Sequence, residues 1–115
     1  AEHKAFLSAY QGKFNDYPRL GSIVGYSMIQ ALAAGIKKAG STDSEKLAVS
    51  FRDLSFTSPF GKVSFRSQDH QSTMGAFVGR IKNDNGKGVM VDYRYLDGAA
   101  FQPSNDEVKK LRAAD

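Results

Sequence analysis

The densest group of polar side chains that could do chemistry lies in the middle of the chain, at Arg66, Asp69, His70 and Gln71. An imidazole oriented by a carboxylate can act as a general base, and the same cluster can anchor a ligand. The alternative is a polar loop between two strands, in which His70 caps or bonds to the backbone. We favour the polar loop. A metal site needs several convergent ligands, and the other histidine, His3, lies in a separate predicted helix.

Other catalytic patterns are missing from the sequence. It has no cysteine, which excludes disulfides, thiolate catalysis and cysteine-bound zinc. No serine stands in a G-x-S-x-G turn, and the glycines do not form a phosphate-binding loop after a strand. We therefore expect no catalytic residue, no metal and no cofactor, and a small enzyme is the least favoured of our alternatives.

The segment from Pro18 to Ser22 is a better candidate for binding. It leads into the start of a predicted helix, where backbone N–H groups lack partners and the helix dipole favours an anionic group. The alternative is an ordinary helix entry, and the residue pattern alone favours that alternative.

The chain is long enough for one domain with one core, and its composition is that of a globular protein. Of its 115 residues 41% are hydrophobic and 24% are charged, and no apolar run approaches the roughly 18 residues that span a bilayer. No signal-peptide pattern opens it. The net charge of +4 allows nucleic-acid binding, but the basic residues are dispersed and form only pairs such as Lys37-Lys38, which favours a solvated surface. Phe77, Tyr93 and Tyr95 could stack on bases, although core packing explains them better.

Three helices are predicted first. Phe6, Leu7, Tyr10 and Phe14 share one face of a helix from Glu2 to Phe14, which starts without a strong cap. The second begins at Gly21-Ser22 with Ser22 as N-cap and ends at Gly40. The third starts with a capping box of Thr42 and Glu45. The predicted apolar stripe of the second helix is Tyr26, Ile29, Leu32, Ala33 and Ile36, and the predicted buried face of the third is Leu47, Ala48, Phe51 and Leu54.

Alternating residues then predict strands. A β-turn at Ser58 to Gly61 leads to a short strand with Val63 and Phe65, and a hairpin signal at Asn83 to Gly88 joins two longer strands. More than one turn fits Asn83 to Gly88, so the register of this hairpin is left open. These strands run from Met74 to Lys82 and from Val89 to Tyr95. In the second of them Val89, Val91, Tyr93 and Tyr95 are predicted to face one way, and Met90, Asp92 and Arg94 the other. A turn at Asp97-Gly98 and a short helix from Asp106 to Arg112, behind a Ser104–Glu107 capping box, complete an α+β fold.

Two features do not fit a self-sufficient domain. The second helix has more apolar surface than a small domain covers easily. The three helices and the hairpin also share no complementary pattern that closes one core. Both features fit a chain that is part of a larger fold.

Read in order, the segments resemble the C-terminal part of the type I periplasmic solute-binding proteins of the branched-chain amino acid group. The resemblance is carried by Phe6 to Asp16, Gly25 to Gly40, Ser41 to Leu54 and Phe56 to Phe65, followed by Asp69-His70-Gln71 and Gly86-Lys87-Gly88. It implies that residues 1–115 are the C-terminal part of a two-lobe α/β protein, with an intact C-terminus. Proteins of this family hold a solute between their lobes.

The resemblance also implies a function and a site. It implies capture of amino acids or related hydrophobic or aromatic carboxylates for an ABC importer, in the periplasm, with a membrane permease as partner. The residues matching cleft positions are Leu20, Gly21, Ser22 and Tyr26. Arg66 to Gln71 would lie near the lobe connections as a structural or hinge loop.

Three further expectations accompany this interpretation. A sensing receptor on the same fold is one alternative, and a stand-alone basic α+β domain that binds nucleic acid is another. Because the chain would expose apolar surface meant for a missing lobe, it is also expected to self-associate as a homo-oligomer.

Overall fold

The computed structural model describes residues 2–112, which divide into two compact units. The unit that ends at Ser72 contains α1 (Glu2–Phe14), α2 (Leu20–Ala39), α3 (Ser44–Ser50), β1 (Ser55–Ser58) and β2 (Gly61–Ser64). The unit that starts at Thr73 contains β3 (Ala76–Asp84), β4 (Lys87–Leu96), the 3-10 helix η1 (Gly98–Phe101) and α4 (Asn105–Leu111). The predicted α+β order is confirmed. The division into two units agrees with the sequence pattern, in which the three helices and the long hairpin do not share one core.

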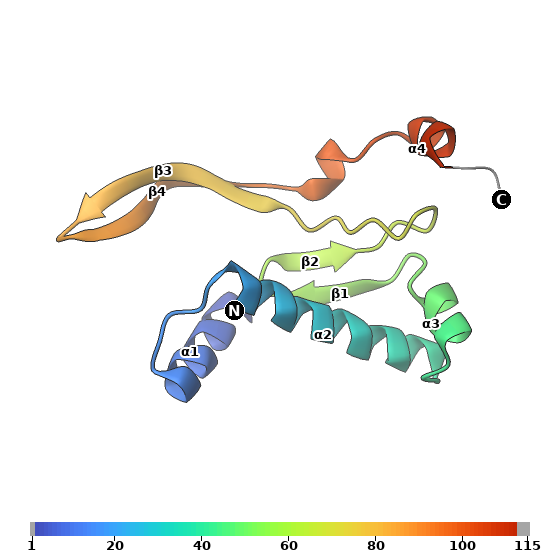
Figure 1. Cartoon of the computed structure of the whole chain (residues 1–115), viewed down its shortest axis with the longest axis horizontal. Coiled ribbons are helices and arrows are strands. Elements are labelled where there is room, and N and C mark those ends of the chain that lie inside the picture. The colour runs from blue at the N-terminus through green and yellow to red at the C-terminus, as the bar shows by residue number, and fades with distance from the viewer. Residues whose placement is uncertain (1, 113–115) are drawn as a thin grey trace. The chain divides into compact units, whose positions relative to one another are not determined.

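In the first unit, α2 lies alongside the antiparallel β1–β2 hairpin, and α1 also contacts β1 (Figure 1). The two strands are joined at the predicted turn, with Ser58 paired to Gly61. Ser58 and Val63 are almost fully buried, and the Ser58 hydroxyl accepts the Phe60 N–H at 3.1 Å. The sequence analysis did not predict β1, because this strand, SFTS, is short and mostly polar.

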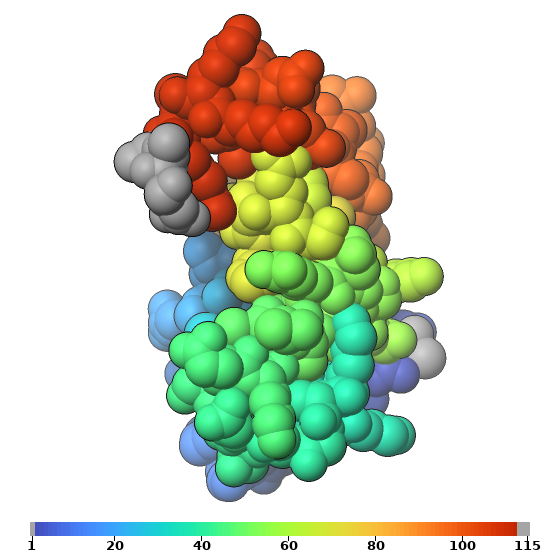
Figure 2. Space-filling model, turned by 90° about the vertical axis from the view of Figure 1, so that its right-hand side faces the viewer, coloured from blue at the N-terminus to red at the C-terminus, as the bar shows by residue number. Residues whose placement is uncertain are grey.

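Helix α2 packs through small residues. Its buried positions are Ser27, Ala31 and Gly35, spaced four apart on one face. A β-carbon on Gly35 would lie 2.8 Å from the ring of Phe51, so the missing side chain is what admits that ring. The Ser50 hydroxyl also donates to the Gly35 carbonyl at 3.1 Å, which confirms that α2 and α3 are neighbours. Figure 2 shows α3, in green, beside the last turns of α2, in teal.

Most of the predicted apolar stripe of α2 therefore lies outside the core, and of its five residues only Ile36 is half-buried. Tyr26, Ile29 and Leu32 are 44%, 62% and 41% exposed, and Met28 is also exposed. The buried face predicted for α3 is confirmed only in part. Leu54 is buried and Leu47 and Phe51 are half-buried, but Ala48 is exposed and the helix ends before Phe51. The physical reason is that close helix packing selects small residues, which carry a weak hydrophobic signal in the sequence.

Two of the four predicted helix caps need correction. Helix α2 begins at Leu20, so Ser22 is not the N-cap; its hydroxyl accepts the Arg19 N–H at 3.3 Å from the third helical position. Helix α3 is capped by Asp43, whose carboxylate accepts the Lys46 N–H at 3.1 Å, and not by Thr42. The left-handed cap at Gly40 is confirmed, with φ of 60°.

The second unit is built on the β3–β4 hairpin, whose two-residue turn at Asn85-Gly86 fixes the register left open by the sequence. A register shift opposite Gly79 interrupts the ladder, and Asp92 there has φ of 50°. A β-carbon on Gly79 would lie 2.8 Å from Tyr93 Cβ and 2.9 Å from Met90 Cγ. Met90 and Tyr93 therefore share a face, and the predicted separation of Met90 from Tyr93 and Tyr95 is wrong. A β-bulge reverses the alternation of side chains at that point.

Helix α4 begins with the predicted capping box. The Ser104 N–H donates to Glu107 Oε2 at 2.7 Å, and the Glu107 N–H donates to Ser104 Oγ at 3.3 Å. The turn predicted at Asp97-Gly98 is the start of η1, where the Asp97 carboxylate accepts the Ala99 N–H at 2.9 Å. The last residues of the chain, 113–115, lie outside the described residues, so the expectation about the C-terminus does too.

The capping box makes the stability of α4 depend on pH. Hydrogen bonds from the side chain and then the backbone of Ser104 lower the pKa of Glu107 below its ordinary value of 4.5. A carboxylate with a lowered pKa stabilises the folded state above the unfolded pKa and loses that contribution as pH falls through the folded pKa. We expect α4 to unwind progressively below pH 4.5, as followed by the amide NMR shifts of Ser104 and Glu107. Glu107→Gln, which does not titrate, should remove this acid dependence, and an α4 unaffected by acid would contradict the argument.

Candidate functional site

The first turn of α2 presents two of its residues to solvent. Leu20 is 75% exposed, and a β-carbon on Gly21 would meet nothing within 4 Å. Pro18 and the extended backbone of Arg19 turn the chain into the helix here, so this turn stands at the end of the helix next to a loop. The surface is therefore open to contact at Leu20 and Gly21.

The other two predicted site residues are fixed against α1. The Ser22 hydroxyl donates to Tyr10 Oη at 3.3 Å, and the ring of Tyr26 lies 5.0 Å from the ring of Phe6. Tyr26 keeps 44% of its surface exposed while its ring contacts the buried Phe6. Helix α1 thus holds this side of α2 in place. The four residues occupy the first two turns of one helix, but they do not converge on one point.

A small groove beside this turn was not anticipated. It encloses about 180 Å³ between α1 and the start of α2. Its lining is mainly apolar, with one arginine and one histidine, and consists of His3, Phe6, Leu7, Tyr17, Pro18, Arg19, Leu20 and Ile23. Leu20 alone of the predicted site residues lines it. The helical period placed Leu7 on the apolar face of α1, but nothing in the sequence shows that α1 packs across the start of α2.

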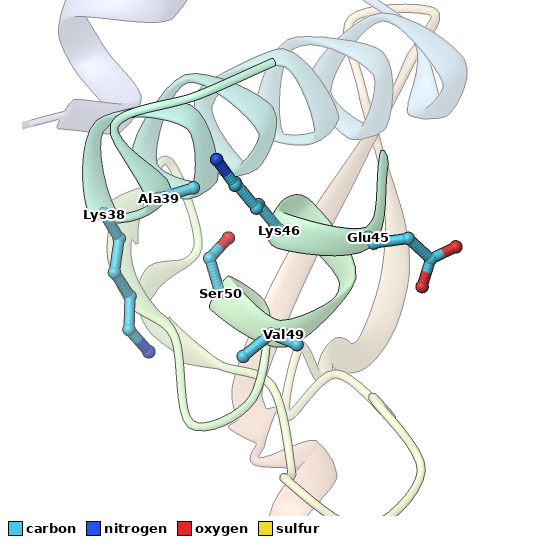
Figure 3. Close-up of a pocket in the computed structure, with 6 residues that line it drawn as sticks. All are labelled: Lys38, Ala39, Glu45, Lys46, Val49 and Ser50. Atoms are coloured by element: carbon cyan, nitrogen blue, oxygen red, sulfur yellow. The ribbon is translucent and has the colours of Figure 1, made fainter. Parts of the chain in front are cut away.

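A second, wider depression lies where α2 meets α3 (Figure 3). It encloses about 510 Å³ and is lined by Lys38, Ala39, Glu45, Lys46, Val49 and Ser50. The Lys38 ammonium donates to the Arg52 carbonyl at 2.7 Å, and the Glu45 carboxylate points outward in Figure 3. Its polar groups therefore do not converge on a ligand position.

The Arg66–Gln71 segment forms a closed polar loop. Asp69 Oδ1 accepts from Arg66 Nε at 3.0 Å and from the Gln71 N–H at 3.0 Å, and Asp69 also pairs with the outer guanidinium nitrogen. The His70 N–H donates to the Arg66 carbonyl at 2.8 Å, with His70 at φ of 58°. The Asp69 hydrogen bonds raise the pKa of Arg66 above its ordinary value. This geometry suits the structural interpretation, and a hinge role stays a prediction.

A metal-binding cluster and a membrane-spanning helix can both be checked for the described residues as a whole. Between residues 2 and 112 no three His, Asp or Glu side chains are grouped to hold a metal ion. No helix in that range is long and apolar enough to cross a bilayer.

Comparison with known proteins identifies the family. The model of the family described as periplasmic binding protein matches residues 1–87. The chain belongs to the periplasmic binding protein family. The match covers all of the first unit and the β3–β4 turn, and it confirms the resemblance found in the sequence.

Individual relatives agree with this assignment. The chain is 34% identical over 64 residues to the leucine-, isoleucine-, valine-, threonine- and alanine-binding protein of Pseudomonas aeruginosa, covering 56% of the chain and 17% of that protein. It superposes on an ABC-type branched-chain amino acid transporter structure from Rhodopseudomonas palustris CGA009 with a TM-score of 0.76 and 30% identity. That match covers 84% of the chain and 26% of the other protein.

A third likeness supports the fold alone. A solute-binding protein of an ABC transporter from Rhodopseudomonas palustris BisB5, solved in complex with 3,4-dihydroxybenzoic acid, matches with a TM-score of 0.72 at 21% identity. It covers 83% of the chain and 26% of that protein. The chain thus spans about a quarter or less of the length of these periplasmic binding proteins, and it corresponds to only part of their fold.

Proposed function

We propose that this chain forms one wall of the solute-binding cleft in a two-lobe periplasmic binding protein. The observation that carries the proposal is the open first turn of α2 in a chain of this family. Leu20 is largely exposed and Gly21 has no neighbour within 4 Å of a β-carbon. An exposed apolar residue beside an uncovered glycine leaves room for an apolar solute group against the helix. Ser22 and Tyr26 border this position.

The proposed solutes are amino acids or related hydrophobic or aromatic carboxylates. The Pseudomonas aeruginosa relative is named for leucine, isoleucine, valine, threonine and alanine, and the Rhodopseudomonas palustris CGA009 relative for branched-chain amino acids. The first turn of α2 fits such solutes because it offers apolar contact at Leu20. The free backbone N–H groups at the start of a helix also favour a carboxylate.

The proposed role is transport without chemical conversion of the solute. Closure of two lobes around the solute would create the form recognised by a membrane permease of an ABC importer. The periplasm is the proposed compartment, because the family and its relatives work with such importers. This chain supplies a part of the cleft, so the solute is held only when the remaining walls are present.

A calorimetric screen tests the proposal. Amino acids and aromatic carboxylates would be titrated into the 115-residue chain and into a two-lobe protein that contains it. We expect binding by the two-lobe protein and no measurable binding by the chain alone. A two-lobe protein that binds none of these solutes would contradict the proposed function. A chain that binds as tightly as the two-lobe protein would contradict the proposed single wall.

We also propose that the isolated chain self-associates through the exposed apolar face of α2, which comprises Tyr26, Met28, Ile29 and Leu32. Contiguous apolar surface of this kind favours association in water. Ile29→Lys places a charge at the centre of this face and is expected to shift the chain to a monomer in light scattering. Gln11→Lys, on the exposed part of α1, is the matched control and should leave the association unchanged. A wild-type monomer at high concentration would refute this expectation.

A further inference from the structure

The turn between β3 and β4 combines a reactive residue pair with a local hydrogen bond to the side chain of Asn83. Asn85 and Gly86 form the whole two-residue loop, with φ of 50° and 82°. Positive φ at both loop residues is the signature of the type I′ turn, which asparagine and glycine tolerate best. Both residues and both flanking strand ends are exposed to solvent. The pair is therefore accessible to water throughout.

An asparagine followed by glycine can react with its own backbone. The nitrogen of Gly86 loses its proton to solvent and attacks Cγ of Asn85, forming a C–N bond. The bond from Cγ to the side-chain nitrogen breaks, and that nitrogen takes up a proton from solvent and leaves as ammonia. Glycine is the least hindered partner for this ring closure, because it has no β-carbon. Water then opens the cyclic imide at one of its two carbonyls, giving aspartate or isoaspartate. The net change is water taken up and ammonia lost, with no cofactor or oxidant.

The side chain of Asn83 opposes this reaction in the folded chain. Asn83 Oδ1 accepts the Gly86 N–H at 2.9 Å, so the proton that the attacking nitrogen must lose is held in a hydrogen bond. The Asn85 amide itself donates to Asp84 Oδ1 at 3.3 Å. Attack requires Gly86 to break the first of these bonds and turn toward Cγ of Asn85. Asn83 therefore protects Asn85 from deamidation.

We propose that Asn85 is a site of spontaneous deamidation whose rate in the folded protein is set by the Asn83–Gly86 hydrogen bond. The products differ in their effect on the hairpin. Aspartate still tolerates positive φ, and it adds a negative charge beside Asp84. Isoaspartate lengthens the main chain by one carbon and cannot fit a two-residue turn. Only the second product should open the β3–β4 ladder.

The test follows deamidation by peptide-mapping mass spectrometry and enzymatic isoaspartate labelling at mildly alkaline pH. In the wild-type chain we expect deamidation at Asn85 to precede that at Asn15 and Asn105, which are both followed by aspartate. Asn83→Ala removes the hydrogen bond and is expected to accelerate reaction at Asn85 by about fivefold, the effect of losing one ordinary hydrogen bond. Asn83→Asp keeps an acceptor oxygen and should stay close to the wild-type rate.

A denatured reference separates folding from sequence. In concentrated urea the wild-type chain and the Asn83→Ala variant should react at Asn85 at the same rate, and both should exceed the folded wild-type rate. Equal folded rates for the wild type and Asn83→Ala would overturn the protecting role. Asn85 reacting no faster than Asn15 would overturn the site itself. If Asn83→Ala opened the hairpin, its rate would equal the urea rate, and the Asn83→Asp variant would still decide whether an acceptor at this position protects.

Discussion

Replacement of Gly75 by alanine is expected to unfold the base of the β3–β4 hairpin. A β-carbon on Gly75 would lie 1.8 Å from the Leu96 carbonyl oxygen and 2.8 Å from the Gly98 nitrogen. Both atoms belong to backbone, which cannot rotate away as a side chain can. The Gly75 N–H also donates to Tyr95 Oη at 2.7 Å, a bond that any displacement of Gly75 would break. We expect a loss of about 3 kcal/mol or more, the upper range for overpacking.

The effect should be confined to the second unit. An isolated two-stranded hairpin is marginally stable, so a loss of this size removes its protection entirely. Amide hydrogen exchange would show rapid exchange along β3 and β4, while α2 and β2 keep the wild-type rates. Gly12→Ala is the matched control, because a β-carbon there meets nothing within 4 Å and alanine favours α1. Slow amide exchange along β3 and β4 in the Gly75→Ala variant would contradict the prediction. It would show that the backbone at Gly75 and at Leu96 can separate enough to admit a β-carbon.

The elements that the sequence predicted well are those with a strong local signal. The bounds of α1 agree at both ends, because its aromatic residues repeat at the helical period and Pro18 prevents its continuation. The turn at Ser58 to Gly61 and a hairpin within Asn83 to Gly88 also agree, since proline, asparagine and glycine select turn geometry directly. Local chemistry was enough for each of these features.

The features that were missed depend on contacts between distant residues. The β-bulge at Asp92 has no glycine at its own position to indicate it; the glycine that makes room, Gly79, is on the partner strand. The buried face of α2 was missed because Gly35 packs against Phe51, the residue that follows α3, and the sequence does not show this contact. Hydrophobic periodicity identified the larger side chains of α2, and these lie on its exposed face.

The candidate site divides in the same way. The open first turn of α2 followed from local sequence, because Pro18 and a helix start place Leu20 and Gly21 at an end of the helix. The groove between α1 and α2 could not be predicted from local sequence, because it forms only when α1 packs on α2 through Phe6 and Tyr26. The family resemblance selected Leu20, Gly21, Ser22 and Tyr26 among many surface positions, which the physical properties of the residues alone could not do.

Leucine in place of Gly21 is expected to block the proposed cleft without disturbing the helix. No other part of the chain lies within 4 Å of a β-carbon placed at Gly21, so a larger side chain can leave the helix here without a clash at its β-carbon. Leucine also has a higher helix propensity than glycine. In a two-lobe protein that contains this chain, the added side chain would occupy room that the proposal gives to the solute. We expect affinity for the largest solutes to fall by about tenfold or more, the scale for misfitting one or two apolar carbons.

The matched control is Gly12→Leu, the same substitution at an equally open position on α1. Calorimetry should show unchanged affinity for that variant, and thermal unfolding should show both variants at least as stable as the wild type. Small solutes such as alanine should lose less affinity than leucine or an aromatic carboxylate, because they leave more of the cleft empty. Equal affinity of Gly21→Leu and Gly12→Leu for every solute would place the binding wall elsewhere. A uniform loss across solutes of all sizes would instead indicate that the added side chain prevents the lobes from closing, since closure is the step that every solute shares.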